Sequence, residues 1–128
     1  MSAGAQARKT LGVVISGRCR DIRELNSLGY PVFARGLSTL GQSPFTRPSA
    51  VNVPLEIHPQ GEGVSFPAVT VHPGDFVVAD ENGVVCVPQG DIQKVVETAK
   101  KGREVDGRCM KDIKAGKGIQ TAFKAHRG

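Results

Sequence analysis

Aromatic residues are scarce in this sequence. It has no tryptophan, one tyrosine and five phenylalanines, so aromatic residues fill only 5% of the 128 positions. They do not alternate with the basic residues, which disfavours a stacking platform for single-stranded RNA. A nucleic-acid partner is therefore disfavoured, and a basic nucleic-acid binder is kept as a third, weaker alternative. Because there is also no apolar run of membrane-spanning length and no signal- or transit-peptide pattern, the sequence predicts a soluble cytoplasmic protein without a membrane partner.

Metal-binding and phosphate-binding motifs are also missing. The three cysteines, Cys19, Cys86 and Cys109, lie far apart, and no CxxC pair exists that would indicate a zinc site. His58 and His72 each precede a proline and have no second histidine at ligand spacing. The sequence lacks a Walker motif and a GxGxxG turn after a strand. An odd number of widely spaced cysteines indicates free thiols in a reducing compartment.

The net charge of +5 is small, and much of the excess lies in lysine- and arginine-rich stretches near the C-terminus. A charge of this size could attract anionic metabolites or nucleic acid, but it decides for neither. A solvated face on the last helix is the more usual reason for such stretches.

Against this background, one apolar stretch followed by two charged residues stands out. Leu11–Ser16 predicts a β-strand that is covered on both faces. The spacing of apolar residues over Arg20–Leu28 predicts a short helix, which Gly29 would end. Arg20 and Asp21 therefore lie where a strand gives way to a helix. Ligands of α/β sheets gather at the carboxyl ends of strands, and a helix start favours anions.

This pair suits a 2-oxo acid. Asp21 could bind a hard divalent cation directly or through water, and Arg20 could bind a carboxylate bidentately. The alternative is structural: an aspartate stabilised by the dipole of the helix beside a surface arginine. From the residue pattern alone the structural alternative is favoured. Asp75, Asp80 and Glu81 are a second candidate cluster, but acidic residues in such turns are usually turn formers.

Short strands and tight turns are expected through the middle of the chain, which contains many of the sixteen glycines and eight prolines. A helix is expected at Met1–Thr10 and a long one at Gln89–Ile113. The expected strands are Tyr30–Arg35, Val51–His58 and the short runs 64–66, 68–71, 76–79 and 83–87. Asn82-Gly83 predicts a hairpin between the last two. The fold class is therefore α/β, in a single domain over residues 1–128 that ends in a flexible tail at 115–128.

Two long segments resemble one family. GVVISGRCRDIRELNSLGYPVFARG, at residues 12–36, and VHPGDFVVADENGVVCVP, at residues 71–88, are similar to the RraA-like family. That family includes 4-hydroxy-4-methyl-2-oxoglutarate aldolase, which also decarboxylates oxaloacetate, and a bacterial inhibitor of ribonuclease E. The resemblance extends from Met1 to about Phe123, and KGREVDGRCMKDIKAGKG resembles the fungal members in particular.

The resemblance implies a swivelling β/β/α domain that assembles as a homotrimer or homohexamer, with active sites between neighbouring subunits. Arg20 matches the substrate-binding arginine of the family. Asp21 matches its Mg²⁺ or Mn²⁺ ligand, which holds the ion largely through water. The implied activity is divalent-metal-dependent cleavage of 2-oxo acids to pyruvate through an enolate, whose negative charge the metal and Arg20 stabilise.

Two departures from the family pattern qualify this expectation. Members carry an N-terminal half that ends in a substrate-holding loop, and the resemblance implies that this chain lacks it. Ser16 stands where many members have aspartate or asparagine. We therefore expect a truncated chain with an unpaired sheet edge and weak catalysis. The alternative function is a non-catalytic regulatory binding protein that resembles the ribonuclease inhibitor.

Overall fold

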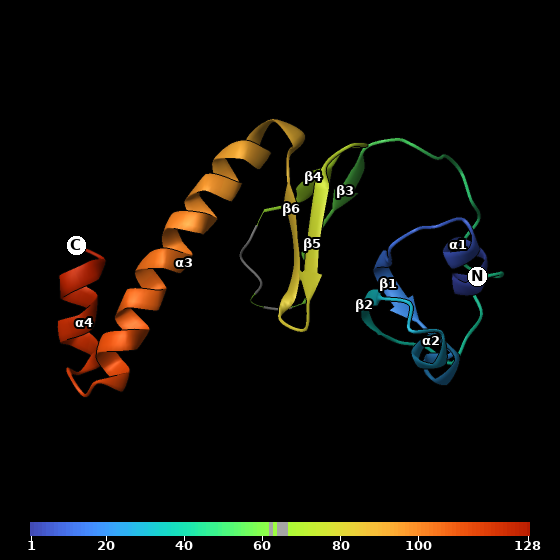
Figure 1. Ribbon diagram of the computed structural model, residues 1–128. Helices are drawn as coiled ribbons and strands as arrows, with labels where there is room; N and C mark the ends of the chain where they lie inside the picture. The colour runs from blue at the N-terminus through green and yellow to red at the C-terminus, as the bar shows by residue number, and fades with distance from the viewer. Residues whose placement is uncertain (62, 64–66) are drawn as a thin grey trace. The chain divides into compact units, whose positions relative to one another are not determined.

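A computed structural model describes residues 1–61, 63 and 67–128 (Figure 1). The chain forms two compact units, residues 1–86 and residues 87–128. The expected single domain stays a prediction, because each unit is described by itself. The first unit contains α1 (Ser2–Ala7), β1 (Val13–Cys19), α2 (Ile22–Leu28), β2 (Val32–Leu37), β3 (Leu55–Ile57), β4 (Val69–Val71), β5 (Phe76–Asp80) and most of β6 (Gly83–Val87). The strand expected at 64–66 lies outside the described residues.

β1 and β2 form a parallel two-stranded sheet, and α2 is the crossover between them (Figure 1). Val13 pairs with Val32, and the register shifts between Ile15 and Arg18. Ser16 and Gly17, where the strand was predicted to end, lie within this shift, and pairing continues to Cys19 opposite Leu37. The prediction of a strand end at Ser16 was therefore wrong by three residues.

The prediction that this strand is buried on both faces was also wrong. Its residues alternate between partly exposed and exposed, and Val14 keeps 49% of its surface. Leu11, which was expected to belong to the strand, is 93% exposed. Apolar runs of this kind are typical of parallel strands with helices on both faces. Here α2 is the only helix in the crossover, so β1 is only partly covered.

The other strands form two small sheets. β3 pairs with β4 in antiparallel register, and β5 pairs with β6. The expected strand at Val51–His58 is reduced to β3, because Asn52 has a positive φ of 57° and Pro54 lacks an amide hydrogen. The hairpin expected at Asn82-Gly83 is confirmed, and the Asp80 carboxylate accepts a hydrogen bond from the Asn82 amide at 2.8 Å.

Few side chains are buried among the described residues: Tyr30, Cys109 and Ala122. In the first unit, the Tyr30 hydroxyl is 2.7 Å from the Thr10 hydroxyl, which ties the segment after α1 to the start of β2. The sheet β5–β6 carries apolar side chains that stay exposed, Val78 at 59% and Val85 at 60%. No helix within the described ranges is long and apolar enough to cross a membrane.

The second unit is a helical hairpin. A short 3₁₀ helix η1 (Gln89–Asp91) leads into α3 (Ile92–Lys114), and α4 (Ile119–His126) packs against α3 (Figure 1). Residues 115–128, expected as a flexible tail, are thus helical over most of their length. Gly116 and Gly118 both have φ of 81°, which makes the turn between the helices. Ala122 then lies against Cys109, with 0% and 2% of their surfaces exposed.

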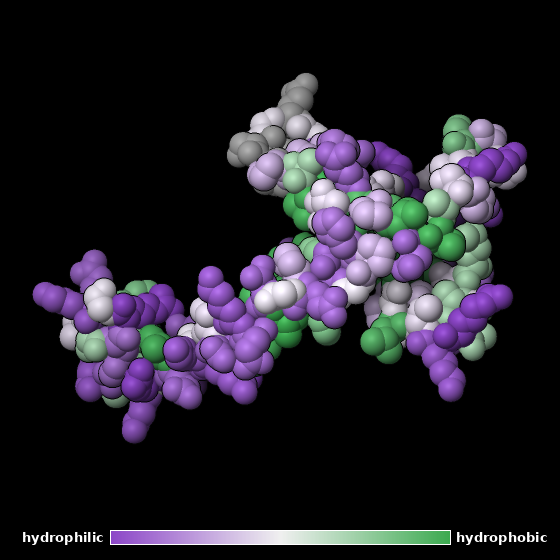
Figure 2. Space-filling model, turned by 90° about the horizontal axis from the view of Figure 1, so that it is seen from above, coloured by the Kyte–Doolittle hydropathy of each residue, from purple (hydrophilic) through white to green (hydrophobic). Residues whose placement is uncertain are grey.

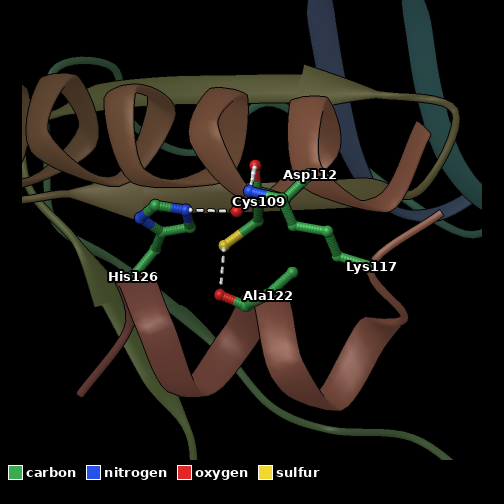
Figure 3. Close-up of polar contacts among 5 residues, drawn as sticks. All are labelled: Cys109, Asp112, Lys117, Ala122 and His126. Atoms are coloured by element: carbon green, nitrogen blue, oxygen red, sulfur yellow. Dashed lines mark hydrogen bonds and ion pairs between the residues drawn. The ribbon is translucent and has the colours of Figure 1, made fainter. Parts of the chain in front are cut away.

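Polar contacts close the hairpin around Asp112 (Figure 3). Its carboxylate accepts from Lys117 Nζ at 2.9 Å and is 3.0 Å from His126 Nε2. The buried Cys109 thiol donates to the carbonyl of Ala122 at 3.7 Å. Hydrogen bonds from Lys117 and then His126 lower the pKa of the Asp112 carboxyl below its ordinary value.

We expect Asp112→Asn to remove a pH-dependent part of the hairpin's stability. A carboxylate whose pKa is lowered by folding stabilises the fold above the unfolded-state pKa, and this stabilisation is lost as the pH falls through the folded-state pKa. Thermal unfolding followed by circular dichroism should therefore show a lower Tm for the variant at pH 7, and a smaller difference below about pH 4. Glu104→Gln, an exposed change on α3, is the control. An equal difference at both pH values would contradict the expectation.

Candidate active site

Arg20 and Asp21 occupy the connection between β1 and α2, as the sequence predicts, since β1 ends at Cys19 and α2 begins at Ile22. Asp21 has φ 64° and ψ 39°, in the left-handed region. Aspartate is one of the few residues that enter this region readily, but the conformation still carries some strain. The backbone carbonyl of Asp21 accepts from the Leu25 amide at 3.0 Å, which starts the helix.

The carboxylate of Asp21 does not cap this helix by a hydrogen bond. Instead, Asp21 Oδ2 is 3.3 Å from Arg20 Nε, and the two side chains are 57% and 51% exposed. The structural alternative, which needs the helix dipole and no capping contact, therefore still stands. It keeps the position at the helix start and the exposed arginine. What the geometry adds is that cation and carboxylate lie together and face solvent.

The other arginines of the β1–β2 sheet are tied to the protein's own chain. Arg18 Nη1 donates to the carbonyl of Leu37 at 2.9 Å. Arg35 Nη2 donates to Ser16 Oγ at 3.0 Å and to the carbonyl of His58 at 2.5 Å. Arg20, in the connection that follows β1, has no such bond to a backbone carbonyl among the described contacts, so its guanidinium can bind an anion.

A glycine of the following loop lies against this guanidinium. A Cβ built on Gly41 would lie 3.7 Å from Arg20 Cζ and from its Nη1. Gly41 is not among the site residues that the sequence predicts. Its only signal was its place in a long glycine-, serine- and proline-rich loop, and loops of that length are often functional.

A divalent cation fits Asp21 only in a mostly hydrated form. The described residues contain no group of three or more histidine, cysteine, aspartate or glutamate side chains that could hold a metal ion. Mg²⁺, however, usually keeps several waters and takes one or two carboxylates. A half-exposed carboxylate that does not cap its helix meets that requirement, so Asp21 fits Mg²⁺ or Mn²⁺ held largely through water.

In the second candidate cluster, the carboxylates of Asp75 and Asp80 accept hydrogen bonds within turns, as expected of turn formers. Asp75 Oδ2 accepts from the His72 amide at 2.8 Å, and Asp80 accepts from Asn82. The bond from the Asn82 amide lowers the pKa of Asp80. Burial, and then the nearby Asp75 carboxylate, raise the pKa of the Cys86 thiol, which makes it a poor nucleophile.

An apolar groove of 280 Å³ lies between α2 and β2, next to the charged pair. It is lined by Cys19, Ile22, Leu25, Asn26, Tyr30, Val32, Ala34, Gly36 and Leu37. No charged side chain lines it, so it does not suit the carboxylates of a 2-oxo acid. The charged pair at the end of β1 therefore stays the candidate site.

Comparison with known families decides what this site belongs to. Residues 1–86, the whole first unit, match the model of the RraA-like family, which is described as Aldolase/RraA. The chain belongs to the RraA-like family. The matched residues include β1, α2 and the Arg20–Asp21 connection, and they stop before the helical hairpin.

RraA-like relatives extend the match beyond the first unit. A protein from Halalkalibacterium halodurans, named provisionally as a 4-hydroxy-4-methyl-2-oxoglutarate aldolase, is 37% identical over 101 residues, 77% of this chain and 43% of that protein. An uncharacterized protein from Methanocaldococcus jannaschii is 30% identical over 122 residues, 95% of this chain and 54% of that protein.

The crystal structure of an uncharacterized protein from Pseudomonas syringae pv. tomato confirms the fold. It matches with a TM-score of 0.81 at 34% identity, over 95% of this chain and 56% of that chain. The expected α/β fold of the RraA-like type is therefore confirmed. The chain spans about half the length of these relatives.

Proposed function

We propose that this protein acts as a divalent-metal-dependent lyase that cleaves 2-oxo acids to pyruvate, as a 4-hydroxy-4-methyl-2-oxoglutarate aldolase and oxaloacetate decarboxylase. The observation that carries the proposal is the 3.3 Å contact between Arg20 Nε and Asp21 Oδ2 at the carboxyl end of β1. The names of relatives at this level of identity support the reaction class. The site is solvent-exposed, which suits a small charged substrate.

Each residue has a distinct part in the proposed reaction. Asp21 holds Mg²⁺ or Mn²⁺ through its carboxylate and intervening waters. When bound, the ion supplies Lewis-acid polarisation of the keto group of the substrate. Arg20 binds the carboxylate of the 2-oxo acid and stabilises the negative charge that develops as the carbon–carbon bond breaks.

The test is Mn²⁺ binding and oxaloacetate decarboxylation by the purified chain. Asp21→Asn keeps a residue that accepts the left-handed conformation but removes the charge, so Mn²⁺ affinity should fall about tenfold and metal-dependent turnover should fall with it. Mn²⁺ binding is measured by electron paramagnetic resonance. Decarboxylation is measured with Mg²⁺ or Mn²⁺ against EDTA, after subtraction of the metal-catalysed rate without protein.

Glu24→Gln is the matched control, because Glu24 is an acidic residue in the first turn of the same helix. It should leave both readouts unchanged. Unchanged Mn²⁺ binding in Asp21→Asn would refute the metal assignment. A folded chain without metal-dependent turnover would refute the lyase assignment for this chain.

A second proposed function is a non-catalytic regulatory binding protein. The exposed apolar side chains of β5 and β6 favour it, since Phe76 is 50% exposed, Val78 59% and Val85 60%. Apolar surface of this kind marks protein–protein contacts. The same exposed apolar surface also supports a homotrimer or homohexamer.

We also propose a reducing, cytoplasmic location, which the free thiols of Cys19, Cys86 and Cys109 support.

A further inference from the structure

The positive charge of the chain is confined to its second unit. Residues 1–86 contain seven basic and seven acidic residues, whereas residues 87–128 contain ten basic and five acidic residues. The α3–α4 hairpin therefore carries the whole formal charge of +5. The proposed active site lies within residues 1–86, the range that the family model matches, so that site does not explain this charge.

Most cations of the hairpin have no acidic partner in the described part of the chain. Asp112 is taken by Lys117 and His126, and Asp106 pairs with Arg127 at 2.5 Å. Eight exposed lysines and arginines remain without an ion pair among the described residues. They are Lys94, Lys100, Lys101, Arg103, Arg108, Lys111, Lys114 and Lys124.

Three of these cations lie along one side of α3. Lys94, Lys101 and Arg108 follow one another every seven residues of α3, which places them on one side of the helix about 10 Å apart. Glu97 and Glu104 lie between these cations on the same face at three- and four-residue spacing and offset two of the three charges, so the excess of seven basic over four acidic residues is a property of α3 as a whole. Figure 2 shows hydrophilic side chains gathered over this hairpin.

The amino-acid composition of the hairpin favours some classes of polyanionic partner over others. Helices that lie on membranes bury tryptophan, phenylalanine or leucine, and α3 has none of these residues. Stacking on single strands needs exposed aromatic rings. The only aromatic residue of residues 87–128 is Phe123, and the guanidinium of Arg127 covers its ring at 4.0 Å. Contact with a charged phosphate backbone needs neither feature.

We propose that the α3–α4 hairpin binds double-stranded nucleic acid through its phosphates, without reading its sequence. This takes up the weaker alternative of a basic nucleic-acid binder, which the scarcity of aromatic residues disfavoured. That argument applies to stacked single strands. A duplex contacted through its backbone requires only an ordered array of unpaired cations, which the docked hairpin supplies.

The test uses the full chain and a short fluorescein-labelled RNA duplex in fluorescence anisotropy titrations between about 50 and 200 mM salt. The triple variant Lys94→Gln, Lys101→Gln, Arg108→Gln removes these three cations. It should bind at least about tenfold more weakly at 100 mM salt, and the slope of log K against log salt should fall by about 2 to 3. A DNA duplex should give the same pattern.

The control triple Arg8→Gln, Lys9→Gln, Arg23→Gln removes the same charge from the first unit and should change affinity by less than about twofold. Equal losses in the two triples would overturn the proposal, because binding would then follow net charge alone. Absence of duplex binding at 50 mM salt would also overturn it. So would tighter binding to a single strand, to vesicles of phosphatidylserine, or to polyglutamate, which would indicate another class of partner.

Discussion

A lysine in place of Arg20 is expected to lower kcat/KM for oxaloacetate by about a hundredfold. Arginine presents a planar fork that can bind a carboxylate bidentately, while its Nε stays next to Asp21 at 3.3 Å. A lysine ammonium is a single point of charge and cannot make both contacts at once. The loss should lie mainly in kcat, because charge builds up on the substrate as the bond breaks.

The measurement is steady-state decarboxylation with saturating Mn²⁺, with Mn²⁺ binding followed separately. Arg23→Lys is the control, since Arg23 lies on α2 within three residues of the site and forms no ion pair with Asp21 among the described contacts. Arg20→Lys should keep its Mn²⁺ affinity, which separates a substrate role from a general disturbance of Asp21. A rise in KM with unchanged kcat would contradict a part for Arg20 in stabilising the developing charge.

The place of this site could be predicted because it depends on local sequence. A run of β-branched residues, a charged pair and a helical spacing follow one another within eighteen positions, and the structure keeps that order even though β1 ends at Cys19 and not at Ser16. Which arginine is available could not be predicted. Arg18 and Arg35 are tied to the carbonyls of Leu37 and His58, and those contacts depend on how distant segments meet.

Burial and the C-terminal helix were predicted less well, for the same reason. The exposed fraction of Val14 depends on which elements cover β1, which local pattern does not contain. Residues 119–126 carry small and basic residues beside two glycines, a composition that is also typical of a frayed end. Contacts with α3 make these residues helical. They join Asp112 to His126, which is fourteen residues further along the chain, and Cys109 to Ala122, which is thirteen residues further along.

Ala122→Glu is expected to release α4 from α3 and to unfold it. Ala122 has no exposed surface and lies against Cys109, so a longer charged side chain would have to enter a contact that has neither room nor a cation placed for it. Overpacking and burial of an unpaired charge together should cost about 3 kcal/mol or more. An eight-residue helix is too short to persist in water without packing, so α4 should lose its structure once it leaves α3.

Amide hydrogen exchange measured on the full chain would show this as lost protection over residues 119–126, with a smaller helical signal in circular dichroism. Ala125→Glu adds the same charge at an exposed position of the same helix and should cost no more than about 1 kcal/mol, through the helix dipole. If Ala122→Glu left the exchange of α4 unchanged, the contact with Cys109 would not be what holds the hairpin closed. Loss of protection in Ala122→Glu alone would show that this contact, rather than the surface ion pairs, orders the C-terminal helix. The array of cations proposed to bind a duplex should then be weakened as well, because Lys124 would no longer be held beside α3.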